Sequence, residues 1–332
     1  MNRLTVEKRR AVIACLVEGN SIRATVRMTG VAKNTVVKLL VDMGTVCSVH
    51  MDQSMRDLTC ERIQCDEMWA FVYAKQKNVP PAKRGEAGDV WTWVAVDADT
   101  KLVPTFRVGP RDLATATSFM TDLASRLRHR VQLTTDGYIT YLLAVDGAFD
   151  GKVDFAQLVK VYGTEADSRK PERRYSPSVC LGADAVRVSG DPDPAHISTS
   201  HIERLNLTTR MSMRRYTRLT NAFSKKVENL TAAVALHFCH YNFCRAHQTL
   251  GAKTTPAMAA GLTDHVWTLD ELIGLLGAAE RTPIKRGSYK RIEPEVISNK
   301  PTTSCRGLHF LYLPFNAATP CGSILREPCG DF

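Results

Sequence analysis

"RIQCDEMWAFVYAK", residues 62–75, is the stretch that decides the fold. Aromatic and aliphatic residues fill it, which predicts one long strand. The segment "DVWTWVAVDADTKLVPTFRVG", residues 89–109, predicts two more strands about a turn at residues 97–100, where Asp and Thr are typical turn formers. A sheet therefore begins at residue 62.

The next segments alternate between helix and strand. "RDLATATSFMTDLASRLRH", residues 111–129, has a helical pattern, and "VQLTTDGYITYLLAV", residues 131–145, is a strand that runs through a Gly turn into a helix. "KVDFAQLVKVYG", residues 152–163, is another short strand. Three strands, a helix, two strands and further helices predict an α/β fold with a mixed sheet.

After the predicted strands, the chain is expected to form an irregular segment, then helices, then a tail. Residues 163–196 hold several Pro and Gly residues and are expected to form an irregular surface segment. Helices are expected from Ser200 to about Thr217 and from about Asn221 to His247. The last 50 residues lack hydrophobic periodicity, so we expect a loosely packed or disordered basic tail. A shifted reading frame at the end of the gene would also produce such a sequence.

Residues 5–43 predict three helices before the sheet. Gly19-Asn20 ends the first helix, Ser21 caps the second, and Gly30 permits a tight turn into the third. This spacing is typical of a helix-turn-helix module. The third helix carries outward polar residues that would face a DNA major groove: Lys33, Asn34, Thr35 and Lys38. The alternative is a plain three-helix bundle whose charged face is merely solvated. Residues 44–58 are expected to be a connector.

The charge balance favours a polyanionic partner. The chain has 44 Lys and Arg against 34 Asp and Glu, which gives a net charge of +10 and points to nucleic acid before an anionic membrane. Neither a transmembrane helix nor a signal peptide is expected, because no long apolar run occurs. The cysteines are scattered, so we expect reduced thiols rather than disulfides.

Three acids are candidates for a shared metal site. Asp66 lies within the first strand, Asp136 ends the fourth strand before Gly137, and Glu203 lies on the first late helix. Phosphodiester chemistry often uses two divalent ions, and Mg²⁺ prefers carboxylate ligands, which must converge from separate elements. Taken singly, the aspartates are also explained as strand-end turn formers and Glu203 as a helix-start charge. Strand alternation excludes Glu67 as a ligand.

Glu203 opens a strongly basic segment. From Arg204 to Lys226 there are seven Lys and Arg residues and no acid. At about 100° per residue, Glu203 shares one helix face with Asn206, Arg210 and Arg214, while an apolar stripe on the other side suits packing on the sheet. The acid would hold metal and its neighbours would contact DNA phosphates. The candidate DNA contacts here are Arg204, Asn206, Arg210, Arg214 and Arg215.

A second metal site is conceivable in "HFCHYNFCRAH", residues 237–247. His240, Cys244 and His247 are spaced to share a helix face, with His237 one turn earlier. Ligands aligned on one helix rarely close around zinc. A packed helix is therefore the favoured interpretation.

Four long blocks of the chain match a known pattern: "CDEMWAFV", "LTTDGY", "RYSPSVCLGA" and "ISTSHIERLNLTTRMSMRRYTRLTNAFSKKVENL". They resemble insertion-sequence DDE transposases of the insertion-sequence-one type. The resemblance extends to about residue 275, and "YNFCRAHQTLGAKTTPAMA" departs from the family only in Ala246, where Pro is common.

This resemblance implies an RNase H-like fold with Asp66, Asp136 and Glu203 as the DDE triad. It implies Mg²⁺ or Mn²⁺ as cofactor, two ions per site, and double-stranded DNA as partner, both transposon ends and target. Such proteins cut DNA by hydrolysis and join the freed 3′-OH to the target. A homo-oligomer on DNA, no membrane, and a place in the bacterial cytoplasm at the nucleoid are expected.

The predicted organisation has three parts. Residues 1–58 form the helix-turn-helix module and connector, residues 59–275 the catalytic domain, and residues 276–332 the irregular basic tail. Three rival functions remain open: a helix-turn-helix transcriptional regulator with a ligand-sensing domain, a stand-alone nuclease, and a transposase-derived DNA-binding protein without catalysis.

Overall fold

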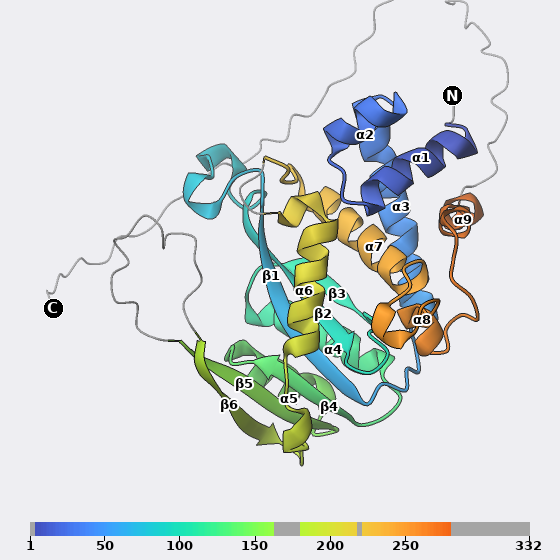
Figure 1. Ribbon diagram of the computed structural model, residues 1–332. Coiled ribbons are helices and arrows are strands. Elements are labelled where there is room, and N and C mark those ends of the chain that lie inside the picture. Colours follow the sequence, from blue (N-terminus) through green and yellow to red (C-terminus); the bar gives the residue numbers. More distant parts are fainter. Residues whose placement is uncertain (1–3, 163–179, 218–220, 280–332) are drawn as a thin grey trace, which may run out of the picture. The chain divides into compact units, whose positions relative to one another are not determined.

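The structure is a computed structural model that describes residues 4–162, 180–217 and 221–279 (Figure 1). Its centre is a six-stranded sheet in the order β3-β2-β1-β4-β5-β6. The strands are β1 Arg62–Val72, β2 Gly88–Asp97, β3 Phe106–Gly109, β4 Val131–Asp136, β5 Val153–Tyr162 and β6 Cys180–Ser189.

The sheet is mixed, as the sequence predicts. β1, β2 and β3 pair antiparallel, whereas β4 lies parallel to β1 and β5 lies parallel to β4. β6 closes the far side antiparallel to β5. The parallel strands β4 and β5 are joined by a helix at Thr140–Phe149, a crossover of the kind that parallel pairing requires. With helices on both faces, this is an RNase H-like α/β fold.

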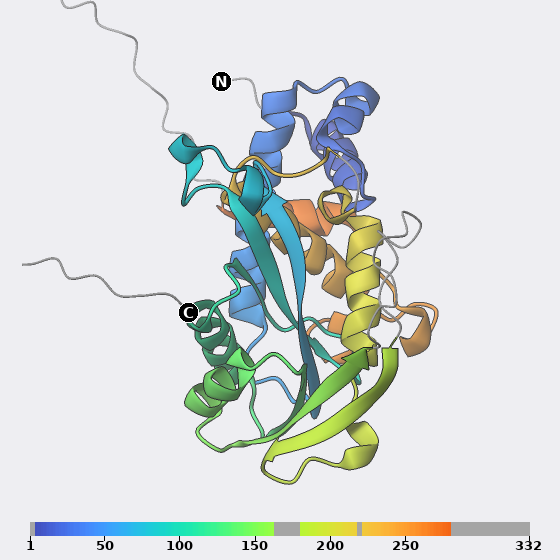
Figure 2. The ribbon, with the colours of Figure 1, turned by 90° about the vertical axis from the view of Figure 1, so that its left-hand side faces the viewer.

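Helices cover the two faces of the sheet unequally. α4 (Leu113–Arg126) and α5 (Thr140–Phe149) pack on one face, and α6 (Ser200–Ser212) packs on the other, as Figure 2 shows. On the first face the fully buried Trp93 meets Tyr141 edge to face, with their ring centroids 5.6 Å apart. The sheet therefore presents its two faces to different helices.

The three N-terminal helices form where the sequence predicts them. They are α1 (Val6–Val17), α2 (Ile22–Thr29) and α3 (Lys33–Ser54). Ser21 Oγ accepts from the Ala24 N–H at 3.1 Å, and Gly30 closes α2 with φ 68°, a conformation that glycine adopts without strain. The predicted outward positions on α3 are all exposed: Lys33, Asn34, Thr35 and Lys38.

The prediction of a connector at residues 44–58 is wrong for most of its length, because α3 continues to Ser54. Buried Cys47 and Met51 extend its apolar stripe. Gly44, which looked like a helix end, instead lets α3 cross α7 (Val227–Phe243) closely. A Cβ at residue 44 would lie 2.3 Å from the Ala232 carbonyl oxygen, so only glycine fits.

The expected irregular segment at residues 163–196 is also corrected in part. Residues 180–189 form β6, while residues 163–179 lie outside the described part of the chain. β6 is exposed along its whole length, so it lacks the buried face that makes a strand visible in a sequence.

The late helices are shorter than expected. α6 ends at Ser212, and a short 3₁₀ turn follows at Arg214–Tyr216. α7 begins at Val227 and ends at Phe243. α8 (Pro256–Ala259) and α9 (Leu269–Ala279) complete the described chain, so residues 276–279, expected in the tail, are helical, and the rest of that tail lies outside the described residues.

Two further properties concern the described ranges as a whole. Within them, no helix combines the length and apolar character needed to cross a membrane. Their cysteines are free thiols, and Cys60 and Cys65 are buried in the sheet region.

Candidate active site

Asp66 and Asp136 meet because their strands are neighbours. β1 and β4 run parallel with Cys65 opposite Thr135, so the next residue of each strand is an aspartate at the same level. Together with Glu67, they offer carboxylate oxygens that all lie within 4.8 Å of one another. Two acids far apart in the sequence thus converge at the end of β4.

Hydrogen bonds fix the orientation of Asp66. Its Oδ1 accepts from the Glu67 backbone N–H at 2.8 Å, and its Oδ2 accepts from Asn206 Nδ2 of α6 at 2.7 Å. Burial and the nearby charge of Asp136 raise the pKa of Asp66 to about 6. A cation bound to both carboxylates would relieve that repulsion.

Glu203 is brought to the same face of the sheet by the docking of α6. Gln64 Oε1, on β1, accepts from the backbone N–H groups of His201 at 2.9 Å and Ile202 at 3.1 Å. These bonds satisfy two of the unpaired donors at a helix start and tie α6 to the strand that carries Asp66. Glu203 follows directly, one turn before Asn206.

The Glu203 carboxylate is itself engaged. Its Oε1 accepts from Thr199 Oγ1 at 2.6 Å and pairs with Lys160 Nζ on β5. Burial raises the pKa of Glu203, but the bonds from Lys160 and Thr199 outweigh it and hold the pKa below its usual value. Glu203 therefore stands beside the three-carboxylate cluster rather than within it.

Glu67 lies closer to the site than strand alternation suggests. Its side chain is on the opposite side of β1 from Asp66, against Tyr141 of α5, and is only 1% exposed. Burial and the charge of Asp136 raise its pKa to about 8. Its oxygen nevertheless reaches the cluster, so the sequence argument placed the side chain correctly but underestimated its reach.

Arg111 supplies a fixed positive charge at the rim. Its Nη2 lies 3.5 Å from Glu67 Oε2 and 3.9 Å from Asp136 Oδ2. Its guanidinium stacks over the Tyr138 ring, 3.9 Å from the centroid, and lies 4.8 Å from that of Trp91. Sequence reasoning missed Arg111 because only the fold places the loop before α4 beside β4.

The donor set fits a hard divalent cation. All cluster ligands are carboxylate oxygens, which Mg²⁺ and Mn²⁺ prefer. One buried oxygen beside them, Asn206 Oδ1, has no hydrogen-bond partner within the described part of the chain. Buried polar atoms are seldom left unpaired, so a cation or its water shell would complete it.

The expected basic ladder on α6 needs correction. The apolar stripe is buried as predicted: Ile202, Leu205, Thr209, Met213 and Tyr216. Asn206, however, is buried against Asp66 rather than turned to solvent. Arg214 falls after the helix end, so it leaves the face of Glu203, whereas Arg204 is exposed and Arg210 half-buried on α6 itself. Helix periodicity failed here because α6 stops early.

A basic groove joins the N-terminal helices to the segment after α6. It measures about 690 Å³, and its lining includes no Asp or Glu. Arg215, which is half-buried, donates from Nε to Ser224 Oγ at 2.9 Å at this groove. Its cationic lining residues are Arg23, Lys33, Arg214, Arg215 and Lys225.

Searches by sequence find neither a matching protein family nor a matching curated protein. Among solved structures, the Mos1 transposase paired-end complex with left transposon end is similar, at 12% identity and a TM-score of 0.21, over 47% of this chain and 60% of that one. The piggyBac transposase synaptic complex with hairpin DNA is similar at 11% identity and 0.35, over 83% and 71%.

Endonuclease V from Bacillus subtilis is similar at 12% identity and a TM-score of 0.22, over 61% of this chain and 92% of that one. This chain thus spans 60% of the length of the Mos1 transposase chain. At such identities a likeness concerns the fold, and the chemistry has to be inferred from the carboxylates themselves.

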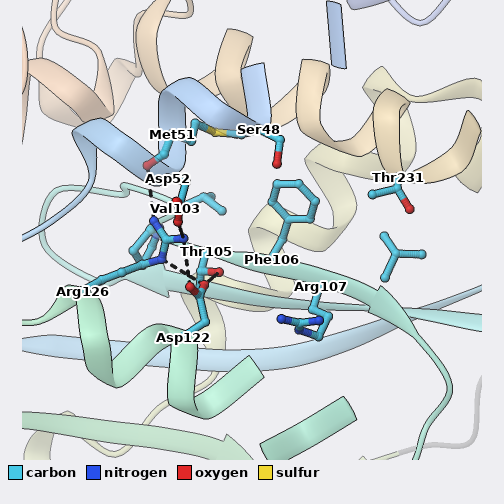
Figure 3. A pocket seen from close by; sticks show the side chains of 12 residues that line it. Ser48, Met51, Asp52, Val103, Thr105, Phe106, Arg107, Asp122, Arg126 and Thr231 are labelled. Carbon is cyan, nitrogen blue, oxygen red and sulfur yellow. Dashed lines mark hydrogen bonds and ion pairs between the residues drawn. The ribbon is translucent and has the colours of Figure 1, made fainter. Parts of the chain in front are cut away.

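A cavity of about 300 Å³ lies between α3, β3, α4 and α7, and its lining includes none of Asp66, Asp136 and Glu203 (Figure 3). Arg126 dominates one wall and donates to Asp52 at 2.7 Å and to Asp122 at 2.9 Å. It also reaches the Met51 and Met55 carbonyl oxygens. A ligand-sensing regulator would need a cavity away from the candidate acids. The cavity found here is lined by hydrogen bonds and ion pairs that tie α3 to α4.

The alternative zinc site does not assemble. α7 ends at Phe243, so Cys244 and His247 leave the helix that would have aligned them with His240. In the described ranges, the acidic cluster is the one group of metal-type ligands within reach of each other. Burial lowers the pKa of His237 to about 3 and that of His240 to about 4, as expected for packed, neutral imidazoles.

His237 predicts a specific acid sensitivity. Because its folded pKa is depressed from 6.5 to about 3, its contribution to stability is present above pH 6.5 and is lost as the pH falls toward 3. The loss is on the order of 3 kcal/mol at pH 4. His237→Leu should flatten this part of the pH profile in urea titrations, and an unchanged slope would contradict the assignment.

Proposed function

We propose that this chain is a DNA transposase of the insertion-sequence-one type. It would bind transposon ends, cleave phosphodiester bonds by metal-dependent hydrolysis, and join 3′-OH ends to target DNA. The observation that carries the proposal is the convergence of Asp66 and Asp136 from adjacent strands, with Glu203 anchored beside them on α6.

In this proposal Asp66, Asp136 and Glu203 hold the metal ions. Two Mg²⁺ or Mn²⁺ ions, when bound, supply a nucleophile at neutral pH and stabilise the leaving 3′ oxygen. Asn206 and the Glu67 backbone N–H keep the Asp66 carboxylate turned toward the cluster. Arg111 lies where a phosphate beside Asp136 would meet its guanidinium.

The positively charged surfaces support DNA as the partner. The exposed start of α3 would contact a transposon end as the recognition helix of a helix-turn-helix, through Lys33, Asn34, Thr35 and Lys38. The basic groove continues from that helix start to Arg214 and Arg215, and Arg204 and Arg210 flank Glu203. Two ends must be joined together, so we propose a homo-oligomer on DNA.

The experiment is a strand-transfer assay with pre-cut ends taken from the DNA that flanks the gene. The full chain should join these ends to plasmid DNA in Mn²⁺ or Mg²⁺, and EDTA should abolish joining. A stand-alone nuclease would cut without joining, and a regulator would bind without cutting. Either of those results would overturn the proposal.

A further inference from the structure

Lys160 is a charged residue in the middle of the site that the proposed chemistry does not use. It lies on β5 opposite Ala183 of β6, and its ammonium reaches across to Glu203 on α6. The side chain is 29% exposed, so much of its stem is buried between the strand and the helix. A lysine in this position is held by the fold rather than placed freely on the surface.

The ion pair determines what Glu203 can do. One oxygen, Oε1, accepts from both Lys160 and Thr199. A metal ion shared with Asp66 and Asp136 would draw that carboxylate toward the cluster. The ion and the ammonium therefore compete for the same negative charge.

The charge of Lys160 is nonetheless felt at the neighbouring acid. It lowers the pKa of Asp66, opposing the larger effects of burial and of Asp136. A cation near three carboxylates reduces their mutual repulsion, as a metal ion would. Lys160 thus has the charge and the place to substitute in part for one divalent ion.

We propose that Lys160 is a positioning residue that controls recruitment of Glu203 to the metal site, by competing with the divalent ion for the Glu203 carboxylate. The inference rests on the proposed function, since it takes Asp66, Asp136 and Glu203 as metal ligands. It makes the two ions unequal. The ion that needs Glu203 has to displace the Lys160 ammonium, so it binds more weakly than the ion held by Asp66 and Asp136.

The test is Mn²⁺ binding to the full chain, measured by calorimetry and by the electron paramagnetic resonance of free Mn²⁺. Lys160→Met keeps the length of the stem and removes the charge, and it should tighten the weaker site about tenfold and the tighter site by a smaller factor. Lys152→Met is the matched control, because Lys152 is exposed just before β5. It should leave both sites unchanged.

Two further variants keep the test decisive. Lys160→Arg retains the positive charge and should keep the weaker site weak, and Lys160→Gln serves if the Met variant does not fold. Unchanged or weaker Mn²⁺ binding in a folded, uncharged variant would overturn the inference, because a purely structural lysine alters stability without tightening a metal site.

Failure of the inference is distinguishable from failure of the proposed function. If Asp66→Asn leaves Mn²⁺ binding intact, the carboxylates are not the metal site and the proposed function fails. If Asp66→Asn abolishes Mn²⁺ binding but Lys160→Met leaves both affinities unchanged, only the role of Lys160 is lost.

Discussion

Asp66→Asn is expected to reduce metal-dependent cleavage and joining of DNA by about a thousandfold, which corresponds to roughly 4 kcal/mol of transition-state stabilisation. The change removes one negative charge from the cluster with Asp136 but keeps the shape of the side chain. The hydrogen bond from Asn206 can persist to the amide oxygen, so α6 should stay docked.

DNA binding separates this effect from misfolding. Affinity for the transposon end should stay within about twofold of wild type, because the proposed DNA contacts on α3 and α6 are untouched. Asp146→Asn is the matched control, since Asp146 is an exposed residue of α5 outside the carboxylate cluster, and it should retain full joining activity. Near-normal joining by the Asp66 variant would rule out the metal site.

Gly44→Ala is expected to destabilise the protein by about 2–3 kcal/mol, although alanine favours helices more than glycine does. The added Cβ would lie 2.3 Å from the Ala232 oxygen and 2.4 Å from its Cα. Both are backbone atoms of α7, so a side-chain rotation cannot relieve the clash. The two helices must separate, and the contacts around buried Cys47 and Met51 weaken.

The opposite sign is expected for the same substitution in α5. Nothing lies within 4 Å of a Cβ added at Gly147, which is exposed. Gly147→Ala should therefore stabilise the protein by up to about 1 kcal/mol through helix propensity alone. Urea unfolding of both variants checks the pair. Equal effects would show that the α3–α7 crossing is looser than the structure indicates.

The sequence predicts best what depends on local pattern. β1 and β2 are recognisable from their composition, and the parallel register of β1 and β4 places Asp66 and Asp136 at one level. The extension of α3 was missed because a glycine inside a helix looks like its end until the crossing partner is known. β6 was missed because neither of its faces is buried.

The parts of the site that sequence could not supply depend on contacts between distant elements. The pairing of Glu203 with Lys160 requires the start of α6 to come close to β5, and the bonds between Gln64 of β1 and that helix start help to hold it there. Helical spacing puts Asn206 on the polar face of α6, and only its hydrogen bond to Asp66 shows that it is part of the buried site. Arg111 is likewise defined by the two rings it stacks on.

The unbroken course of α3 has a consequence for how far from the recognised bases the chain can act. Its 22 residues span roughly 33 Å, from the exposed start to the carbonyls that Arg126 of α4 holds. If the start of α3 contacts DNA bases, the length of the helix sets the distance between those bases and the site of cleavage. Inserting residues within α3 would therefore shift the cleavage position, or rotate the DNA-contacting residues about the helix axis.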